Sequence, residues 1–125
     1  MLNNILIYIG SIIIIIWGIA HLIPTKTVIA GYGNISRDNK LILIMEWVAE
    51  GLTLIFIGAL TLLINILNGY KNPASLNVFR ISAVILLIMA ILTAFTGART
   101  KVVFFKICPF VKTIVAVLLL LAVYL

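Results

Sequence analysis

The stretch that decides the fold runs from Leu41 to Leu67 and reads LILIMEWVAEGLTLIFIGALTLLINIL. It is long and apolar enough to cross a bilayer as a helix, because a spanning helix needs about 20 apolar residues. Yet it carries two acids, Glu46 and Glu50. This one segment therefore predicts both a membrane-spanning helix and a polar feature inside the membrane.

The rest of the chain is apolar as well. Of its 125 residues, 65% are hydrophobic and 10% are charged, and the mean hydropathy is +1.35. A typical soluble domain is about half apolar and a quarter charged, so the composition predicts an integral membrane protein. Its spanning segments must be helical, because lipid offers no hydrogen-bond partners to an open sheet edge. Four helices are expected, at about 4–23, 41–67, 76–97 and 109–125.

These helices use almost the whole chain, so residues 1–125 are expected to form a single transmembrane domain. Short connections make consecutive helices antiparallel neighbours. The expected fold is all-α, an integral membrane up-down four-helix bundle. Pro109 suits the first turn of the fourth helix. Ser36, Asp38 or Asn39 is expected to cap the second helix by accepting a hydrogen bond from a free amide.

Basic residues are unevenly distributed between the connections. Seven of the nine lie in or beside the first and third connections, namely Lys26, Arg37, Lys40, Arg99, Lys101, Lys106 and Lys112. Short loops rich in Lys and Arg stay in the cytoplasm. Loops 24–40 and 98–108 are therefore expected to be cytoplasmic and both termini extracytoplasmic, in the cell membrane. This topology and contact with lipid headgroups explain the net charge of +6, so nucleic acid is not an expected partner.

Polar groups from different helices are expected to meet in the cytoplasmic half of the bundle. Glu46 and Glu50 share one face of their helix, because residues four apart are neighbours. A charge at the bilayer centre costs about 2.5–3.5 kcal/mol, so this face is expected to turn inward, toward partners or a water-filled cavity. The expected pocket contains His21, Glu46, Glu50, Thr53, Thr93, Thr96 and Arg99, with Lys112 as a further candidate charge partner.

Alternative interpretations of the acids stay open. A protonated Glu50 could simply hydrogen-bond across helices and add to assembly. Glu46 could reach the headgroups or pair with Lys40 or His21. His21, Glu46 and Glu50 could also hold a divalent metal, although their spacing matches no tight metal motif. No sequence motif identifies a cofactor.

Small and aromatic residues have structural explanations in the sequence. Gly51 and Gly58 lie on another stripe of the second helix, where they would let a neighbouring helix approach closely. The aromatic residues Trp17, Trp47, Phe104 and Phe105 are expected at the inner membrane interface, as in the usual aromatic belt. The single cysteine, Cys108, excludes an intrachain disulfide.

Two segments carry a resemblance to small bacterial or archaeal membrane proteins of the DoxX-like group: GIAHLIPTKTVIAGYGNISRDNKLILIMEWVAEGLTLIFIGAL and FTGARTKVVFFKICPFVKT. The first contains a His-x-x-Pro-Thr and a Met-Glu-Trp-x-x-Glu segment. The resemblance covers most of the chain and implies a four-helix bundle. Some DoxX-type proteins are associated with quinone or thiol redox systems. No catalytic residue is transferred from the resemblance.

Three functions are compatible with these features. The first expectation is a protein that binds or transports a small solute, ion or proton through the His/Glu/Glu pocket. Four helices make a small solute path, so a homo-oligomer or a partner membrane protein is expected. An accessory subunit of a membrane complex would use the acids to pair with another chain. An intramembrane acid–base enzyme would act on a lipid, isoprenoid or quinone, with the same three residues moving protons.

Overall fold

The computed structural model describes all 125 residues, and every regular element in it is helical. The elements are α1 (Leu2–Leu22), α2 (Thr25–Ala30), α3 (Arg37–Asn68), α4 (Pro73–Phe95), the 3-10 turn η1 (Gly97–Arg99) and α5 (Val103–Tyr124). As predicted, four segments are long and apolar enough to cross a membrane: α1, α3, α4 with η1, and α5. Large apolar side chains such as Ile16, Phe56 and Phe95 stay exposed on their outer faces, as a surface in contact with lipid requires.

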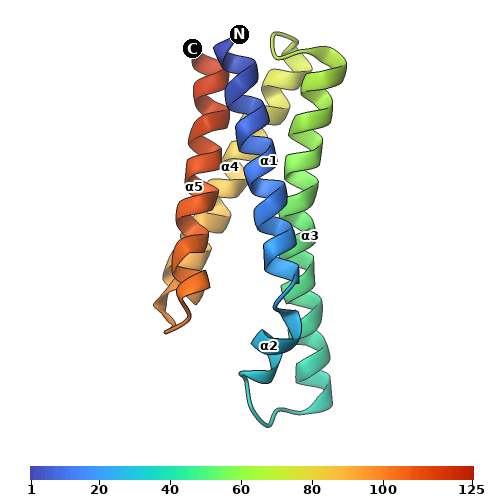
Figure 1. Cartoon of the computed structure of the whole chain (residues 1–125), viewed down its shortest axis with the longest axis vertical. Helices are drawn as coiled ribbons and strands as arrows, with labels where there is room; N and C mark the ends of the chain where they lie inside the picture. The colour runs from blue at the N-terminus through green and yellow to red at the C-terminus, as the bar shows by residue number, and fades with distance from the viewer.

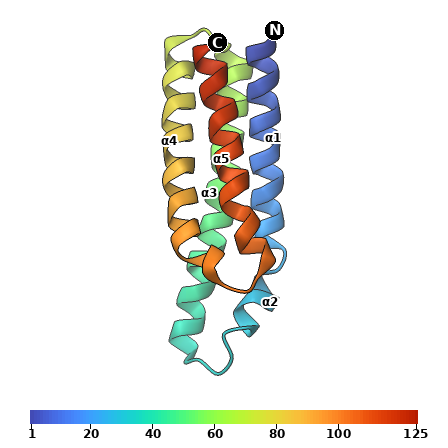
Figure 2. The ribbon, with the colours of Figure 1, turned by 90° about the vertical axis from the view of Figure 1, so that its left-hand side faces the viewer.

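The helices form a bundle in which α1 packs against α3 and α5, and α4 packs along α5 (Figures 1 and 2). Both chain ends lie at the same end of the molecule (Figure 1). At the opposite end, α2 and the start of α3 project beyond the connection between α4 and α5 (Figures 1 and 2). The helices α3 and α4 are consecutive in sequence but contact each other far less than the other packed pairs do. This weak contact leaves room between them.

The core of the bundle is apolar, and a pair of buried hydroxyl groups crosses it. Its largest fully buried members are Ile7, Ile14, Leu54, Phe79, Leu86, Val115 and Leu119. Within the same layer, the hydroxyl groups of Ser11 and Thr61 lie 2.7 Å apart and link α1 to α3. A buried hydroxyl without a partner costs free energy, so the two side chains satisfy each other.

Glycines set the distance between α1 and α3. A Cβ atom on Gly18 would lie 2.8 Å from the carbonyl oxygen of Gly51, and one on Gly58 would lie 2.7 Å from the carbonyl oxygen of Ser11. Backbone atoms cannot move away from such a contact as a flexible side chain can. The predicted role of Gly51 and Gly58 in close helix packing is therefore confirmed, and the partner helix is α1.

The start of α5 differs from the prediction. The helix begins at Val103, so Pro109 lies inside it and not in its first turn. Proline has no N–H to donate to the carbonyl of the residue four positions earlier, but spanning helices tolerate internal proline when neighbouring elements pack around it. Here Phe104 stacks on Trp17 of α1, with ring centroids 4.7 Å apart. That tertiary contact holds residues before the proline in the helix.

The connection between the first two spanning helices is more ordered than the predicted loop. Pro24 follows the end of α1 and is the N-cap of the short helix α2. The N-cap of α3 is Ser36, whose hydroxyl accepts a hydrogen bond from the amide nitrogen of Asn39 at 3.2 Å. This confirms one of the three predicted caps. Because Ser36 is the cap, α3 starts at Arg37 and is longer than a bilayer requires.

We expect Gly58→Ala to destabilise the protein, because the new methyl group would press on the backbone of α1. Overpacking of this kind costs about 1–3 kcal/mol. The matched control is Gly10→Ala, since a Cβ there would meet its nearest neighbours, on Leu118 and Val115, at an ordinary 3.6 Å. Thermal unfolding in detergent measures both variants. Equal unfolding midpoints for the two would contradict the close approach of α1 and α3.

Candidate functional site

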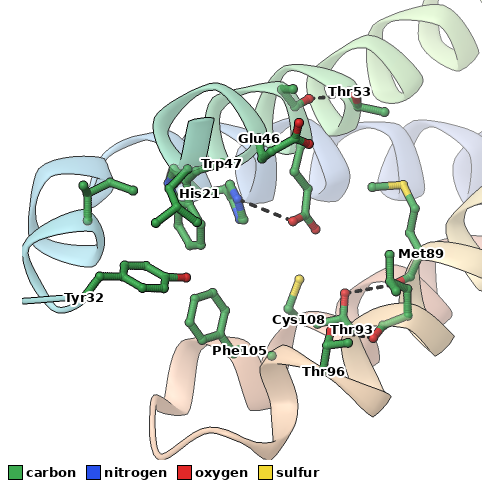
Figure 3. A pocket seen from close by; sticks show the side chains of 16 residues that line it. His21, Tyr32, Glu46, Trp47, Thr53, Met89, Thr93, Thr96, Phe105 and Cys108 are labelled. Carbon is green, nitrogen blue, oxygen red and sulfur yellow. Dashed lines mark hydrogen bonds and ion pairs between the residues drawn. The ribbon is translucent and has the colours of Figure 1, made fainter. Parts of the chain in front are cut away.

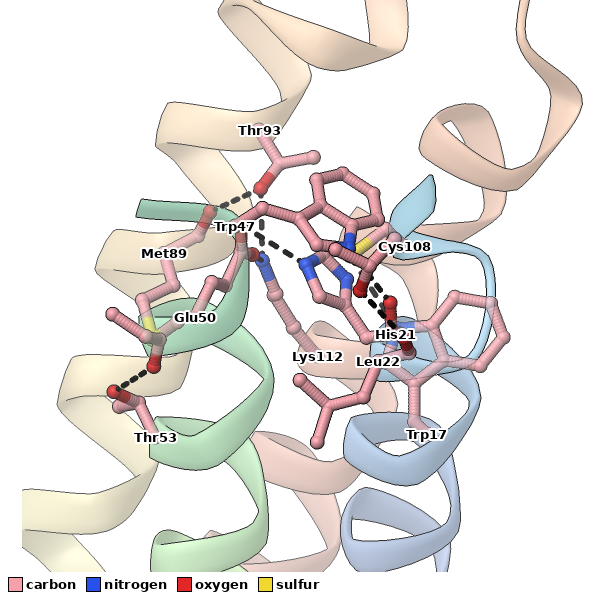
Figure 4. Close-up of polar contacts among 12 residues, drawn as sticks. Trp17, His21, Leu22, Trp47, Glu50, Thr53, Met89, Thr93, Cys108 and Lys112 are labelled. Carbon is pink, nitrogen blue, oxygen red and sulfur yellow. Dashed lines mark hydrogen bonds and ion pairs between the residues drawn. The ribbon is translucent and has the colours of Figure 1, made fainter. Parts of the chain in front are cut away.

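An ion pair between α3 and α5 forms the centre of the candidate site. The ammonium group of Lys112 donates a hydrogen bond to Oε1 of Glu50 (Figure 4). It also donates to the hydroxyl of Thr93 on α4 at 2.9 Å. The Lys112 side chain is 0% exposed, whereas that of Glu50 is 33% exposed. A buried lysine needs such partners to offset the cost of losing water. The same contact gives the carboxylate of Glu50 the opposite charge that was expected to compensate it inside the membrane.

His21 of α1 lies against the same carboxylate. Its Nε2 is 3.8 Å from Oε2 of Glu50, which is beyond hydrogen-bond distance. The residue is 1% exposed, and neither ring nitrogen has a hydrogen-bond partner. Figure 4 shows the His21 ring beside the carboxylate of Glu50. An unpaired buried polar group costs roughly 1–3 kcal/mol, so the imidazole has unused hydrogen-bonding capacity at this point.

Aromatic contacts hold this imidazole in place. Trp47 of α3 stacks on the His21 ring, with centroids 3.9 Å apart and an interplanar angle of 18°. The Nε1 of Trp47 also donates to the backbone carbonyl of His21 at 2.9 Å. Between α1 and α5, the Nε1 of Trp17 donates a hydrogen bond to the sulfur of Cys108 at 3.4 Å. The junction of α1, α3 and α5 is therefore fixed by packing as well as by charge.

A cavity of about 450 Å³ lies beside Glu50, between α3 and α4 (Figure 3). This volume is within the range typical of small-molecule sites. The wall combines carboxylates, hydroxyls, aromatic rings and aliphatic side chains. Its lining residues are His21, Ile29, Tyr32, Leu43, Glu46, Trp47, Ala49, Glu50, Thr53, Met89, Leu92, Thr93, Thr96, Gly97, Phe105 and Cys108.

The structure places all but one of the predicted pocket residues on this wall. Those present are His21, Glu46, Glu50, Thr53, Thr93 and Thr96. The exception is Arg99, which is exposed in η1 and whose guanidinium group lies over the ring of Phe95, 5.6 Å from its centroid. The helix α4 ends at Phe95, so the turn that follows carries Arg99 away from the cavity. Lys112 is bonded to Glu50 but does not line the cavity.

The two acids of α3 have different environments. Glu50 is held in the ion pair, whereas Glu46 is exposed, takes part in no ion pair and lies at the rim of the cavity. Both acids line the cavity, as expected for a helix face that turns toward one, although the side chain of Glu46 is also exposed. The start of α3 projects beyond α4 and α5 (Figure 1), so this part of the helix has fewer neighbours to cover it.

The geometry does not support the metal site considered from the sequence. No three His, Cys, Asp or Glu side chains lie close enough together to hold a metal ion. Of the three residues considered, His21 and Glu50 are neighbours. The third, Glu46, is separate from them at the exposed rim.

Sequence reasoning missed several residues of the cavity wall. It assigned Trp47 and Phe105 to an interface belt, but both line the cavity. Trp47 could have been found, because it precedes Glu50 by three positions and residues with that spacing share a helix face. No comparable signal exists for Phe105 or Tyr32, whose positions depend on how the connections between helices fold.

Comparisons with known proteins add no identification. No protein-family model, curated protein or solved structure matches the chain. The DoxX-like resemblance therefore stays a prediction, and the function has to be inferred from the site.

We expect the ion pair to respond unequally to loss of either partner. Glu50→Leu leaves Lys112 charged and fully buried, and an uncompensated buried charge of this kind costs about 3–5 kcal/mol. Lys112→Met leaves Glu50, which is 33% exposed and can be hydrated from the cavity, so its cost is smaller. The double variant Glu50→Leu/Lys112→Met should recover most of the loss. Unfolding in detergent measures all three, and a double variant no more stable than Glu50→Leu would contradict this coupling.

Proposed function

We propose that the protein is a multi-pass membrane protein that binds a small molecule in the cavity beside Glu50, as a binding or transport protein. One observation carries the proposal. A partly exposed carboxylate and a buried imidazole without hydrogen-bond partners face a cavity large enough for a ligand. Ionisable residues inside a membrane usually mark a pathway for a solute, an ion or a proton.

The hydrogen-bonding groups of the site that have no partner suit a ligand with a polar head. Lys112 uses Oε1 of Glu50, while no hydrogen bond engages Oε2 or either nitrogen of His21. A neutral imidazole offers one donor and one acceptor, and a carboxylate offers acceptors only. A ligand that bonds to both groups would relieve the unsatisfied ring. A proton that either group takes up from solution or releases to it would change the net charge at the site, which is how such a site would couple binding to protons.

The proposed topology places loops 24–40 and 98–108 in the cytoplasm and both termini outside the cell membrane, with four helices that cross up and down. The distribution of basic residues supports this orientation. The common position of the two termini (Figure 1) is what an even number of crossings requires. The cavity then lies toward the cytoplasmic end. A complete transport path would need a second copy or a partner chain, because four helices make a small solute path.

An acid–base enzyme is the second candidate, and the contact of His21 with Glu50 favours it. The 3.8 Å between Nε2 and Oε2 places two proton-carrying groups within reach of the same bound molecule. General acid–base catalysis needs such a positioned pair. The substrate class would be a lipid, isoprenoid or quinone, since the cavity lies between two apolar helices.

We expect a cavity-filling variant to lose a bound small molecule that the wild type retains. Ala49 lines the cavity, so Ala49→Trp would occupy the ligand's place. Ile88→Trp is the matched control, because Ile88 is 55% exposed on α4 and does not line the cavity. Native mass spectrometry of protein released from membranes measures bound molecules. A wild type without any bound small molecule, or equal binding in both variants, would count against the proposal.

The orientation can be tested separately with cysteine labelling. In a Cys108→Ser background, Lys101→Cys in the third connection should react with a membrane-impermeant maleimide only after the cells are opened. Lys71→Cys, in the turn before α4, should react in intact cells. Both positions are exposed, so access to the reagent depends on the side of the membrane alone. The reverse labelling pattern would invert the proposed topology.

A further inference from the structure

We infer that the ligand is an amphipathic organic cation. Its cationic head, of the alkylammonium type, binds at Glu50 and Glu46, and its apolar part lies between α3 and α4. This inference rests on the proposed binding function and specifies the chemical class of the ligand.

The charge of the cavity wall favours a cation. The charged side chains that line the cavity are Glu46 and Glu50, and no Lys or Arg lines it. Lys112 is fully buried and bonded to Glu50, so it neutralises one acid but offers no free charge to a ligand. Two negative charges and one positive charge leave a single negative charge, which one monovalent cation balances. An anionic ligand would instead meet the carboxylate of Glu46 without any compensating contact.

The hydrogen-bonding groups at the cavity favour a ligand that donates hydrogen bonds. Oε1 of Glu50 already accepts from Lys112, while Oε2 faces the imidazole of His21 without a bond. The ring is buried and unpartnered at both nitrogens, and a neutral imidazole has one nitrogen that accepts. An ammonium group can donate to this nitrogen and to Oε2 together. The buried, unsatisfied ring is thus the observation, independent of the two acids, that points to a ligand.

The aromatic lining is compatible with the same head group. The rings of Tyr32, Trp47 and Phe105 line the cavity beside the acids. Aromatic faces attract cations that lie within about 6 Å of the ring centroid. Aromatic rings and carboxylates together form a wall that stabilises positive charge and offers nothing comparable to an anion.

The opening between α3 and α4 accounts for the apolar part of the ligand. Leu92 and Met89 of α4 line the cavity opposite the acids. Leu92 is also 63% exposed on the outer face of α4, so the cavity wall continues into the surface that contacts lipid. The two helices contact each other little. A hydrocarbon tail can therefore extend from the polar head toward the acyl chains of the bilayer.

The many basic residues at this end of the molecule do not contradict the inference. Arg99, Lys101 and Lys106 lie in or beside the connection between α4 and α5, and none of them lines the cavity. Their placement suits contact with lipid headgroups at the membrane surface. An anion held there would bind outside the cavity, so blocking the cavity would leave its binding unchanged.

Three probes of equal chain length test the charge of the ligand: n-octylammonium, n-octanoate and n-octanol. The wild-type protein in phosphatidylcholine nanodiscs is titrated with each at neutral pH by calorimetry, with empty nanodiscs as the blank. We expect saturable binding of n-octylammonium, no saturable binding of n-octanoate, and loss of n-octylammonium binding in Ala49→Trp but not in Ile88→Trp. We also expect Glu46→Gln to weaken n-octylammonium binding roughly tenfold, because it removes the unbalanced negative charge that attracts the ammonium group.

Glu46 is a suitable position for this test because its side chain is exposed and free of ion pairs, so its replacement leaves the Glu50–Lys112 contact intact. An unchanged unfolding midpoint confirms that the variant is folded. The inference is overturned if n-octanoate or n-octanol binds as tightly as n-octylammonium, or if Glu46→Gln has no effect. Should n-octanoate bind and Ala49→Trp prevent it, the cavity still binds ligands and only the cation class fails. Should no probe bind, the cation class fails, and the mass spectrometric experiment decides separately on the proposed function.

Discussion

The contact between Glu50 and Lys112 is the constraint on which the rest of the site depends. Both charges lie within segments that are otherwise apolar, and each would be costly there without the other. Their pairing ties α3 to α5, and the second hydrogen bond of Lys112, to Thr93, adds α4. Because Lys112 approaches from the buried side, the carboxylate keeps its other oxygen available to the cavity. A contact that stabilises the bundle thus also presents a polar group to the cavity.

The packing of the helices explains why the cavity lies where it does. Glycines bring α1 and α3 into close backbone contact, and this contact positions His21 under Trp47 and beside Glu50. The helices α3 and α4 have no equivalent contact along their length. The cavity therefore lies between them, at the end where α3 extends beyond its neighbours. The same arrangement gives one polar wall and one wall that continues into the lipid-facing surface.

Predictions of helix ends and helix faces were reliable where the structure depends on residues that are neighbours in sequence. Ser36 caps α3, and the glycine stripe of α3 packs against another helix, both as expected from adjacent residues. They failed at Pro109, where stacking of Phe104 on Trp17 extends the helix before the proline. The deciding contact there comes from a distant part of the chain.

The sequence by itself determined the all-helical class, the four apolar segments long enough to span a membrane, and most of the polar residues that line the cavity. These follow from composition and from the helical period, which are local properties. Only the tertiary structure decided that Lys112 is the basic residue paired with Glu50 and that His21 is left without hydrogen bonds. It also placed in the cavity wall aromatic residues that had been expected at the membrane interface. These depend on the relative rotation and depth of separate helices, and a single helix's periodicity carries no information about either.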